Sequence, residues 1–503
     1  MSNRRFYITT AIPYVNGDPH VGFALECVQA DVLARHRRHR GDEVRFLSGT
    51  DDNSLKSVQA ADAAGVPVAN FVNDKARRFA ALRELLQLSY DDFIRTSVDQ
   101  RHRPGVERLW RACAATGDLY QRGYEGLYCT GCEAFLAEHE LVSGLCPEHR
   151  QPPELVSEQN WFFRLSRHQS TILGLIESGE LRIEPEHRRN EILRFIRGGL
   201  TDFSVSRSIQ RSRGWGIPVP DDPSQSIYVW FDALGNYITA LGYGDDGKLY
   251  RTWWRDAAQR LHVIGKGIIR FHAIYWPAIL LSADEPLPTA IFVHDYLTSN
   301  GGKLSKSSGN AVEPAELIDR YGPDALRWWF LRDVPRVGDA DFREELLAKR
   351  ADELADDLGN LISRVVTLVA RSRPNDPPPG HSGPAVPLPL HTAAESLAAR
   401  IDRALAEFDF RAATGAIVDV IAEANRFIST ARPWDIAKRE RKGEDPASPE
   451  LDAILAVLLG VCRTLGHELS PFLPAAAARI TDSLDRLDST TARRLFRKAQ
   501  RRE

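Results

Sequence analysis

The first fifty residues alternate between strand-like and helix-like patterns, and this alternation restricts the fold more than any other feature of the chain. A strand-like run at residues 6–11 leads through the turn PYVNGDPHVG into a helical pattern at residues 23–40 and a second strand-like run at residues 43–48. Strand, helix and strand at this spacing predict an α/β fold with a parallel, doubly wound sheet. Ligands of such sheets bind at the carboxyl ends of the strands. The turn and the polar cluster GTDDNS after the second run are therefore expected at a binding edge.

Length, charge and hydropathy indicate the number of domains and exclude some classes of protein. A chain of 503 residues exceeds what one hydrophobic core usually serves, so we expect about three domains. The formal net charge of −3 excludes a chain that is basic throughout, and any nucleic-acid contact must come from local patches. No apolar run reaches the roughly 18 residues of a membrane span, and the N-terminus lacks the apolar core of a signal peptide. We expect a cytoplasmic protein without a membrane segment.

The pattern of the first segment is interrupted and then resumes. Residues 116–224 hold three of the six cysteines, several prolines and glycines, and the strand-like NWFFRLS. Strand-like alternation returns at residues 226–243 and again at residues 260–281, which indicates a nucleotide-binding fold split by an insertion. From about residue 314 helical patterning dominates, interrupted by a proline-rich linker at residues 373–390.

Four residues of the insertion, all of types that bind metals, are spaced as two close pairs. They form the pattern Cys129-x2-Cys132-x13-Cys146-x2-His149. Two knuckle-like pairs of soft or borderline ligands suit tetrahedral zinc, with free thiols as the alternative. Because all four positions would be filled by protein, the expected role is structural. The scattered cysteines are expected to be buried thiols: Cys27, Cys113 and Cys462.

Two short motifs have the composition of phosphate-binding segments. Pro19-His20-Val21-Gly22 lies where the first strand hands over to a helix, so glycine, helix N–H groups and an imidazole could meet phosphate oxygens. Lys303-Leu304-Ser305-Lys306-Ser307 lies in a glycine-flanked loop whose two lysines suit a pyrophosphate leaving group. Taken singly, each motif is also compatible with a structural turn or a solvated loop.

Together, in this order and about 280 residues apart, the two motifs resemble the HIGH and KMSKS signatures of class I aminoacyl-tRNA synthetases. The segments AIPYVNGDPHVG, NEILRFIRGGLTDFSVSR, WGIPVP, YVWFDAL, VIGKGIIRFHAIYWPAILL and FVHDYLTSNGGKLSKSSGN resemble methionyl-tRNA synthetases, and the resemblance covers nearly the whole chain. It implies a split Rossmann-type catalytic domain, a zinc-bearing insertion, a stem-contact region and an α-helical anticodon-binding domain. The implied boundaries are residues 1–115 and 225–298 for the catalytic halves, 116–224 for the insertion, 299–355 for the stem-contact region and 356–503 for the anticodon-binding domain.

The resemblance also implies the activity: methionine and ATP form methionyl-adenylate, and the methionyl group passes to tRNA(Met). ATP would carry Mg²⁺, and one structural zinc ion is expected per chain. Charge stabilisation would come from His20, Lys303 and Lys306. The implied ATP-binding residues are Gly17, His20, Gly22, Lys303, Ser305 and Lys306. The implied methionine-binding residues are Ile12, Tyr14, Asp51, Trp230, Ala233, Tyr237, Ile268, Phe271, His272 and Trp276.

The helical region carries the implied anticodon readers Asn360, Arg364 and Trp434. An aromatic plane can stack an unpaired base, and Asn and Arg can hydrogen-bond base edges of a splayed loop. The sequence ends at RRLFRKAQRRE, which could be a solvated tail or a contact to tRNA phosphates. We expect a monomer.

Three positions beside the expected ATP and carboxylate sites depart from the family pattern. The second histidine of the HIGH-like motif is Phe23, the GKD run has Gly267 in place of its acid, and residues 51–54 read DDNS without the usual His-Gly pair. Internal methionine is absent, and Leu304 stands in the KMSKS-like loop. Two alternatives stay open at this point. One is a paralogue that passes the adenylate to a small amine, and the other is a non-catalytic protein that binds tRNA or methionine.

Overall fold

The computed structural model divides the chain into two compact units, each of them discontinuous in sequence. Unit 1 comprises residues 1–19, 40–82 and 89–294, and unit 2 comprises residues 20–39, 83–88 and 295–503. The first helix thus belongs to unit 2, although the strands before and after it belong to unit 1. The structure describes residues 5–129, 134–148, 150–299, 302–303, 312–374, 388–444 and 448–498.

Unit 1 is built on a six-stranded sheet in which every neighbouring pair is parallel, with the order β3-β2-β1-β12-β13-β7. The chain runs outward from β1 in one direction to β2 and β3, and in the other direction it adds β12 and β13. The order therefore reverses between β1 and β12, and such a reversal is where doubly wound sheets bind ligands. The predicted α/β class is confirmed. The strands are β1 (Arg5–Thr10), β2 (Glu43–Thr50), β3 (Asp92–Arg95), β7 (Arg182–Glu184), β12 (Gln259–Gly265) and β13 (Ala290–His294).

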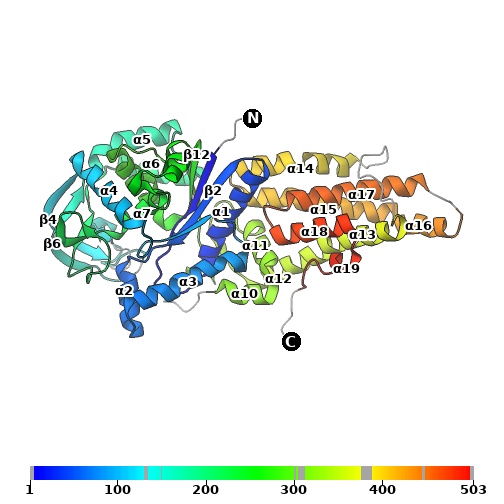
Figure 1. Ribbon diagram of the computed structural model, residues 1–503, viewed down its shortest axis with the longest axis horizontal. Coiled ribbons are helices and arrows are strands. Elements are labelled where there is room, and N and C mark those ends of the chain that lie inside the picture. Colours follow the sequence, from blue (N-terminus) through cyan, green and yellow to red (C-terminus); the bar gives the residue numbers. More distant parts are fainter. Residues whose placement is uncertain are drawn as a thin grey trace. The chain divides into compact units, whose positions relative to one another are not determined.

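Helices α4 to α7 gather with the sheet in unit 1 (Figure 1). Five of the six residues of β1 are buried, as expected of a central strand covered on both faces. The core beside it includes the fully buried rings of Tyr7, Trp254 and Trp276. The helices of this unit are α2 (Leu55–Ala64), α3 (Val68–Leu86), which runs on into unit 2, α4 (His102–Ala115), α5 (Gln169–Ser178), α6 (Glu186–Arg197), α7 (Val229–Thr239), α8 (Lys248–Tyr250) and α9 (Trp276–Ser282).

The strand-like alternation expected at residues 226–243 is wrong for most of that segment. Only residues 226–227, the end of strand β11 (Asp222–Ile227), are extended there, and most of the remaining segment forms α7. All residues of α7 except Trp230 are buried. A helix that is buried on all sides has no polar face, so its sequence lacks the 3.6-residue period that would have identified it. Residues 260–281 begin as β12, as expected, and continue as helical turns into α9.

The predicted insertion, residues 116–224, contains both antiparallel sheet and a part of the parallel sheet. Its largest sheet has the order β5-β4-β6-β8, and a second small sheet has the order β10-β11-β9. Strand β7 also lies inside this segment, yet it pairs with β13 at the edge of the parallel sheet. The remaining strands are β4 (Leu119–Cys129), β5 (Ala134–Leu136), β6 (Glu154–Phe163), β8 (Phe203–Ser204), β9 (Ser206–Ser208) and β10 (Pro218–Val219).

Unit 2 is mainly helical, as the sequence predicted, and Figure 1 shows its long helices running alongside one another. Several helices begin with proline in their first turn, where the missing N–H costs no hydrogen bond. Among the described residues, no helix is both long and apolar enough to cross a membrane. The helices are α1 (Val21–His39), α10 (Pro314–Tyr321), α11 (Pro323–Arg332), α12 (Glu344–Glu353), α13 (Asn360–Ser372), α14 (Leu388–Ala406), α15 (Phe410–Ala431), α16 (Pro433–Arg441), α17 (Pro449–Glu468), α18 (Pro474–Arg486) and α19 (Ser489–Ala492).

A buried arginine joins three segments of unit 2. Arg327 of α11 is fully buried and pairs with the equally buried Asp31 of α1 at 2.8 Å. Its guanidinium also donates to the backbone carbonyl oxygens of Leu86 (2.9 Å) and Phe472 (2.7 Å). Because burial disfavours the charged form, the pKa of Arg327 is lowered, and the ion pair with Asp31 opposes that shift. The three segments are thus held by one charge that has several partners.

We predict that Arg327→Ala destabilises the protein by about 3–5 kcal/mol, because it leaves the Asp31 carboxylate buried without its guanidinium. Denaturant-induced unfolding measures this change. Arg426→Ala is the matched control, since Arg426 forms an exposed pair with Glu423 and such pairs contribute roughly 0–1 kcal/mol. Equal effects of the two substitutions would show that the buried pair has no special importance.

Candidate functional site

The loops that follow β1 and β2 meet at the carboxyl edge of the sheet. Tyr14 and Asp51 form a parallel bridge, and the Asp51 N–H donates to the carbonyl oxygen of Pro13 at 3.0 Å. Asp51 is buried, and its Oδ1 accepts the backbone N–H of Asn53 at 3.1 Å. The structure thus brings Tyr14 and Asp51, two of the predicted methionine-binding residues, side by side.

An outer layer of half-buried aromatic rings lies in unit 1. Trp230 of α7 stacks on Phe271 with ring centroids 3.7 Å apart and an interplanar angle of 5°. Tyr14 meets Trp230 edge-on at 6.3 Å. The indole Nε1 of Trp230 is buried and has no hydrogen-bond partner among the described residues. Three rings from distant segments thus form one surface that carries a spare donor.

A second, buried layer lies behind these rings. The Tyr237 hydroxyl is 2.7 Å from His272 Nε2, and His272 Nδ1 is 2.9 Å from the carbonyl oxygen of Ile268. A carbonyl only accepts, so Nδ1 carries the proton and Nε2 accepts from Tyr237. Burial lowers the pKa of His272 to about 4, which keeps the ring neutral near pH 7. The predicted residues Ala233 and Trp276 are buried as well.

His262 of β12 completes the buried layer, although the sequence analysis did not identify it. The Trp276 indole donates to His262 Nε2 at 3.2 Å, so the ring proton is on Nδ1, 2.8 Å from Thr9 Oγ1. The rings of His262 and Tyr237 are 4.1 Å apart. Burial lowers the pKa of His262 well below its usual value. A histidine followed by the apolar run Val263–Ile264 was the available signal, but its partners lie far away in sequence.

The acidic cluster DDNS divides into separate roles. The carboxylate of Asp52 pairs with Arg95 at 2.8 Å and accepts the hydroxyl protons of Thr50 and Ser97, so Asp52 is committed to holding the loop. Ser54 caps α2 by accepting the N–H of Lys56. Of the two acids, Asp51 has the position expected of a ligand-binding residue, while Asp52 is part of the scaffold.

Asn53 joins the cluster to a buried network that the sequence analysis missed. Its amide donates to Asp232 Oδ2 at 2.7 Å, and the other oxygen of Asp232 is bonded to His102 Nε2. His102 Nδ1 in turn is 2.7 Å from Thr239 Oγ1. Asn53 therefore ties the polar loop to α4 and α7, at a place where the family pattern has His-Gly.

Gly267 lies in the short helical turn Lys266–Ile268 that follows β12. Gly267 is exposed. Its neighbour Ile268 is half-buried, and the carbonyl oxygen of Ile268 is the one that His272 Nδ1 contacts. The next turn, Phe271–Tyr275, is π-helical and carries Phe271 and His272. Such turns are common at functional sites because the extra residue redirects neighbouring side chains.

His20 begins unit 2 with a fixed ring orientation. The Gly22 N–H donates to His20 Nδ1 at 3.0 Å, so the ring proton of the neutral side chain is on Nε2. A Cβ on Gly22 would lie 2.8 Å from His20 Cε1, and therefore this ring position requires glycine. Phe23 and Ala24 donate their N–H groups to the His20 carbonyl as α1 begins. The result is an imidazole with a donor at the start of a helix.

The exit of the lysine loop lies beside His20. The Val21 N–H, next to His20, donates to the carbonyl oxygen of Val312 at 3.0 Å, and Val312 lies five positions after Ser307. At the loop's entry, the backbone of Lys303 belongs to β15 (Gly302–Lys303), which pairs with β14 (Leu297–Ser299), and β14 also pairs with β16 (Ala340–Asp341). The predicted ATP-binding residues Ser305 and Lys306 lie outside the described residues, as does the side chain of Lys303.

Gly17 lies in unit 1, in the bend before His20. The neighbouring Asp18 carboxylate pairs with Lys75 at 3.0 Å and with Arg78 at 3.1 Å. These ion pairs hold the bend against α3.

Two of the four predicted zinc ligands are described. Cys129 ends β4 and pairs across to Ala134 of β5, so Cys129 lies at the end of the β4–β5 pairing. Cys146 begins a tight turn in which the Arg150 N–H donates to the Cys146 carbonyl oxygen at 2.8 Å. Both cysteines are buried, whereas Cys132 and His149 lie outside the described residues. As expected, Cys27, Cys113 and Cys462 are buried free thiols.

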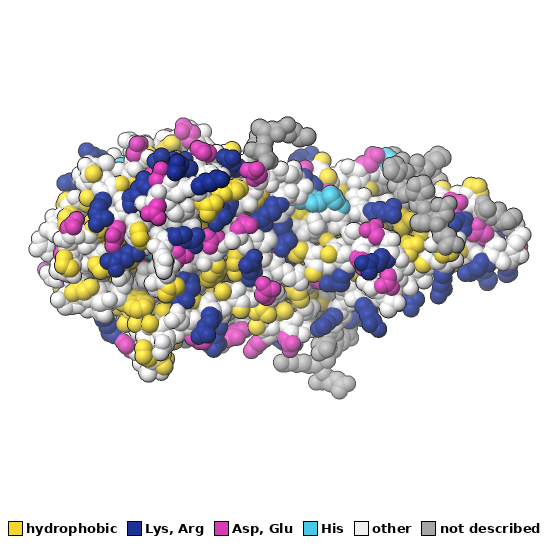
Figure 2. All heavy atoms as spheres, viewed as in Figure 1, with side chains coloured by type: hydrophobic (Ala, Val, Ile, Leu, Met, Phe, Trp, Pro, Cys, Tyr) yellow, Lys and Arg dark blue, Asp and Glu magenta, His cyan; other side chains and the backbone are white. Residues whose placement is uncertain are grey.

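A cavity of about 350 Å³ in unit 2 contains two of the predicted anticodon readers. The Arg364 guanidinium lies over the Trp434 ring, 5.9 Å from its centroid, and Trp434 is 41% exposed. Asn360 is exposed one turn before Arg364 on α13 and shares its face. Lys and Arg side chains gather along this end of unit 2, near α16 (Figure 2). The other arginines that line the cavity are Arg371, Arg441 and Arg493.

A π-helical turn, Leu354–Gly359, lies directly before Asn360 in an otherwise continuous helix from α12 to α13. The Asn425 amide donates to the carbonyl oxygen of Asp357 at 3.0 Å, which satisfies a carbonyl within that turn. The turn shifts the face that α13 presents, and Asn360 is the first residue after it.

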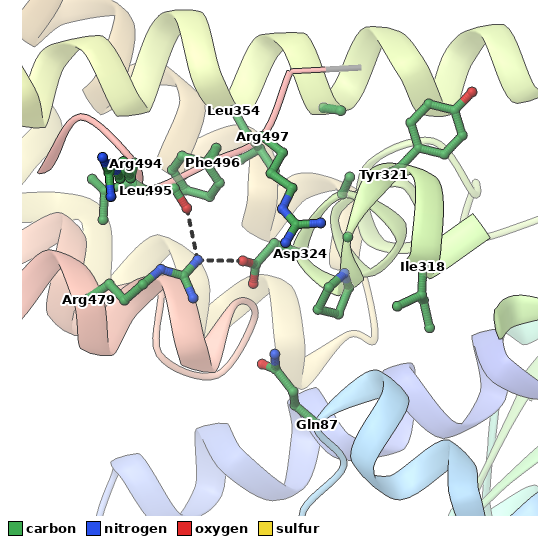
Figure 3. Close-up of a pocket in the computed structure, with 14 residues that line it drawn as sticks. Gln87, Ile318, Tyr321, Asp324, Leu354, Arg479, Arg494, Leu495, Phe496 and Arg497 are labelled. Atoms are coloured by element: carbon green, nitrogen blue, oxygen red, sulfur yellow. Dashed lines mark hydrogen bonds and ion pairs between the residues drawn. The ribbon is translucent and has the colours of Figure 1, made fainter. Parts of the chain in front are cut away.

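The end of the chain packs against unit 2 as far as it is described. Arg479 of α18 donates to Asp324 and to the carbonyl oxygen of Leu495 (Figure 3). Leu495 is buried, and Phe496 lines a cavity of about 350 Å³. Residues 494–497 are therefore held by side-chain packing and one arginine.

Comparison with known proteins gives concordant matches. The family model described as "tRNA synthetases class I (M)" matches residues 6–152 and 149–366. The methionine–tRNA ligases of Brucella suis biovar 1 (strain 1330) and Caldanaerobacter subterraneus subsp. tengcongensis are each 40% identical over 96% of this chain, which covers 92% and 74% of their lengths. The structure of Mycobacterium tuberculosis methionyl-tRNA synthetase in complex with methionyl-adenylate matches with a TM-score of 0.89 and 39% identity, over 95% of this chain and 93% of that chain.

We predict that acid weakens the fold through His272. Its folded pKa of about 4 lies below the ordinary value, so the unfolded chain binds the proton more tightly. The stability is complete above about pH 6.5 and is lost as the pH falls toward 4, by about 3 kcal/mol in total. Denaturation midpoints across this range measure the loss. His272→Gln should flatten the dependence, whereas the exposed control His187→Gln should leave it unchanged; an unaltered slope in His272→Gln would exclude this origin.

Proposed function

Because this chain belongs to the class I tRNA synthetase family of the methionyl type, we propose that it is a methionine–tRNA ligase. Methionine and ATP would form methionyl-adenylate and pyrophosphate, and the methionyl group would then pass to the 3′ end of tRNA(Met). The methionine carboxylate attacks the α-phosphorus, so no side-chain nucleophile is needed. The protein contributes positioning and charge stabilisation. The observation that carries the proposal is the Val21–Val312 hydrogen bond, which joins the residue after His20 to a residue five positions beyond Ser307 of the lysine motif.

The phosphates would be met by groups of unit 2. His20 offers Nε2–H as a donor, since Nδ1 already accepts from Gly22. Charge that develops on the α-phosphate in the transition state would be stabilised by this donor and by Lys303 and Lys306. ATP would be bound with Mg²⁺ on its phosphates, which lowers the negative charge that the lysines must balance.

The methionine side chain would lie on the outer aromatic layer of unit 1. A thioether is apolar and polarisable, and it packs favourably against aromatic rings such as Trp230 and Phe271. The buried layer of Tyr237 and His272 is neutral and fully hydrogen-bonded within itself, so it offers no charge that would favour a polar competitor. The unpartnered Trp230 Nε1 is a donor that a bound ligand could use.

The substrate ammonium would pair with Asp51. A buried ammonium needs a carboxylate partner, and Asp51 is buried at the edge where the β1 and β2 loops meet. Asp52, in contrast, is already paired with Arg95 and bonded to two hydroxyl groups. The division of roles between the two acids follows from their partners.

The departures at Phe23 and Gly267 remove one imidazole and one carboxylate relative to the family pattern. Phe23 is buried in α1 and offers no polar atom, and Gly267 is exposed without a side chain. We propose that phosphate stabilisation therefore rests on His20 and the lysine loop. The DDNS segment keeps its position through Asn53 and the Asp232 network.

One zinc ion would be held by Cys129, Cys132, Cys146 and His149. The described pair fits this role, because Cys129 lies at the end of the β4–β5 pairing and Cys146 at the start of a tight turn, and both thiols are buried. Four protein ligands leave no position for water, so the ion would be structural.

Recognition of tRNA would use the cavity around Trp434. Its exposed ring can stack an unpaired base, with Arg364 beside it and Asn360 one helical turn from Arg364 as hydrogen-bond donors. Three further arginines line the same cavity and suit phosphate groups. The anticodon loop of tRNA(Met) is the proposed partner.

We predict that Asp51→Ala raises the KM for methionine on the order of 10- to 100-fold, because a charged hydrogen-bond partner of the ammonium is lost. ATP–pyrophosphate exchange at varied methionine concentration measures this, and the KM for ATP should change little. The exposed Asp419→Asn, which pairs with Arg400, serves as the control. A methionine KM equal to that of the parent protein would contradict the assignment of Asp51.

We predict that Trp434→Ala lowers kcat/KM for tRNA charging on the order of 10- to 100-fold, the loss of one base–aromatic stack. Methionine-dependent ATP–pyrophosphate exchange, which needs no tRNA, should be unchanged. Trp434→Phe retains an aromatic plane and should recover most of the charging rate. A parallel loss in both assays would instead indicate that Trp434 stabilises the fold.

We predict that Cys146→Ser loses the zinc ion and makes the segment around residues 129–150 sensitive to proteolysis, while the parallel sheet stays folded. Metal analysis and limited proteolysis measure the two effects. Cys462→Ser removes another buried thiol, in α17, and should keep its zinc. Full zinc content in Cys146→Ser would rule out this ligand set.

A further inference from the structure

Two histidines and a glutamate meet in unit 2, outside the residues assigned above to methionine, ATP, tRNA and the zinc knuckle. His39 is the last residue of α1, and His467 and Glu468 are the last two residues of α17. One ligand atom of each lies within 4.8 Å of the others. Glu468 Oε1 is 3.9 Å from His39 Nε2 and 3.9 Å from His467 Nε2. Figure 2 shows histidine side chains gathered in a patch on the surface of this unit.

The donor set suits a borderline divalent cation. Zinc binds imidazole nitrogen and carboxylate oxygen at about 2.0–2.2 Å, which places neighbouring ligand atoms roughly 3.3 Å apart in a tetrahedron. The distances of 3.9 Å therefore need to shorten by roughly half an ångström. His467 can make this movement, because its side chain is 65% exposed. Glu468 is buried and supplies the negative charge of the set.

The surroundings of His39 orient its ring for a metal. Its Nδ1 is 3.3 Å from Ser470 Oγ, and the hydroxyl oxygen can accept the Nδ1 proton. In that tautomer the lone pair is on Nε2, the atom 3.9 Å from Glu468 Oε1. A histidine that binds a metal through Nε2 needs this tautomer. Both α1 and α17 also end at the cluster, and the carboxyl end of a helix favours a cation.

We propose that His39, His467 and Glu468 form a second zinc site, with water in the fourth position. The ion joins the carboxyl end of α1 to the carboxyl end of α17. Helix α1 begins at the residue after His20 and spans about 28 Å. Zinc at its far end restrains the helix that carries the phosphate-binding histidine.

The test is a titration of the purified full chain with ZnCl2. Calorimetry measures the affinity for zinc, and the thermal midpoint of unfolding is measured with and without zinc. We expect a zinc equivalent whose affinity falls at least about tenfold in His467→Ala, since even orienting residues carry that much. His391→Ala is the matched control: His391 is an exposed histidine 3.1 Å from Glu395 on α14. The control should bind zinc like the parent protein, and zinc should raise the thermal midpoint of both by more than it raises that of His467→Ala.

Comparing the parent protein with His467→Ala makes the result independent of the cysteine site, whether or not that site holds zinc. Co²⁺ gives a second readout, because this site would show d–d bands without a thiolate charge-transfer band, and His467→Ala would lose them. Ser470→Ala should weaken the affinity without abolishing it. Equal zinc affinity and equal thermal response in the parent protein and His467→Ala would overturn the proposal, as would cobalt bands unaffected by His467→Ala.

Discussion

The buried pair of Arg327 and Asp31 is the interaction on which the organisation of unit 2 depends. Asp31 lies in the middle of α1, and α1 follows directly on His20. Arg327 belongs to α11, and through the Leu86 and Phe472 carbonyls it also holds the end of α3 and the turn before α18. A guanidinium buried this deeply persists only because each of its three nitrogens has an acceptor. Helix α1, which follows the proposed phosphate-binding residue His20, is thereby fixed within the helical unit that contains the proposed tRNA-binding cavity.

The proposed methionine site depends on a different kind of interaction: hydrogen bonds fix the tautomer of each buried histidine ring. Carbonyl, hydroxyl and indole partners leave His272 and His262 neutral, with their protons on Nδ1. His20 has the opposite tautomer because the Gly22 N–H occupies its Nδ1. The buried rings thus support an apolar ligand, while His20 offers a donor for an anion. Both arrangements exist before any ligand binds, so little reorganisation is needed during the reaction.

The sequence predicted what depends on local pattern and on family motifs. The strand–helix–strand start, the parallel sheet and the helical second half follow from hydrophobic periodicity, and the motifs identified Tyr14, Asp51, Trp230 and His272 as neighbours. Helix α7 was not predicted, because a buried helix has no polar face and therefore shows no helical period in its sequence. Arg327 belongs to a residue type that is usually exposed, and His262 lies in a strand. Both acquire their roles only through partners far along the chain. The same holds for His39 and His467, which lie far apart in the sequence and whose rings are 4.0 Å apart in the structure.

The most direct measurement is ATP–pyrophosphate exchange by the purified protein with each of the twenty amino acids, followed by charging of tRNA(Met). We expect exchange with methionine and with no other amino acid, in the absence of tRNA, and methionyl transfer when tRNA(Met) is added. Exchange with another amino acid would contradict the methionine site, and absence of exchange with all twenty would contradict catalysis by His20 and the lysine loop. Exchange without charging of tRNA(Met) would show that the adenylate goes to a different acceptor.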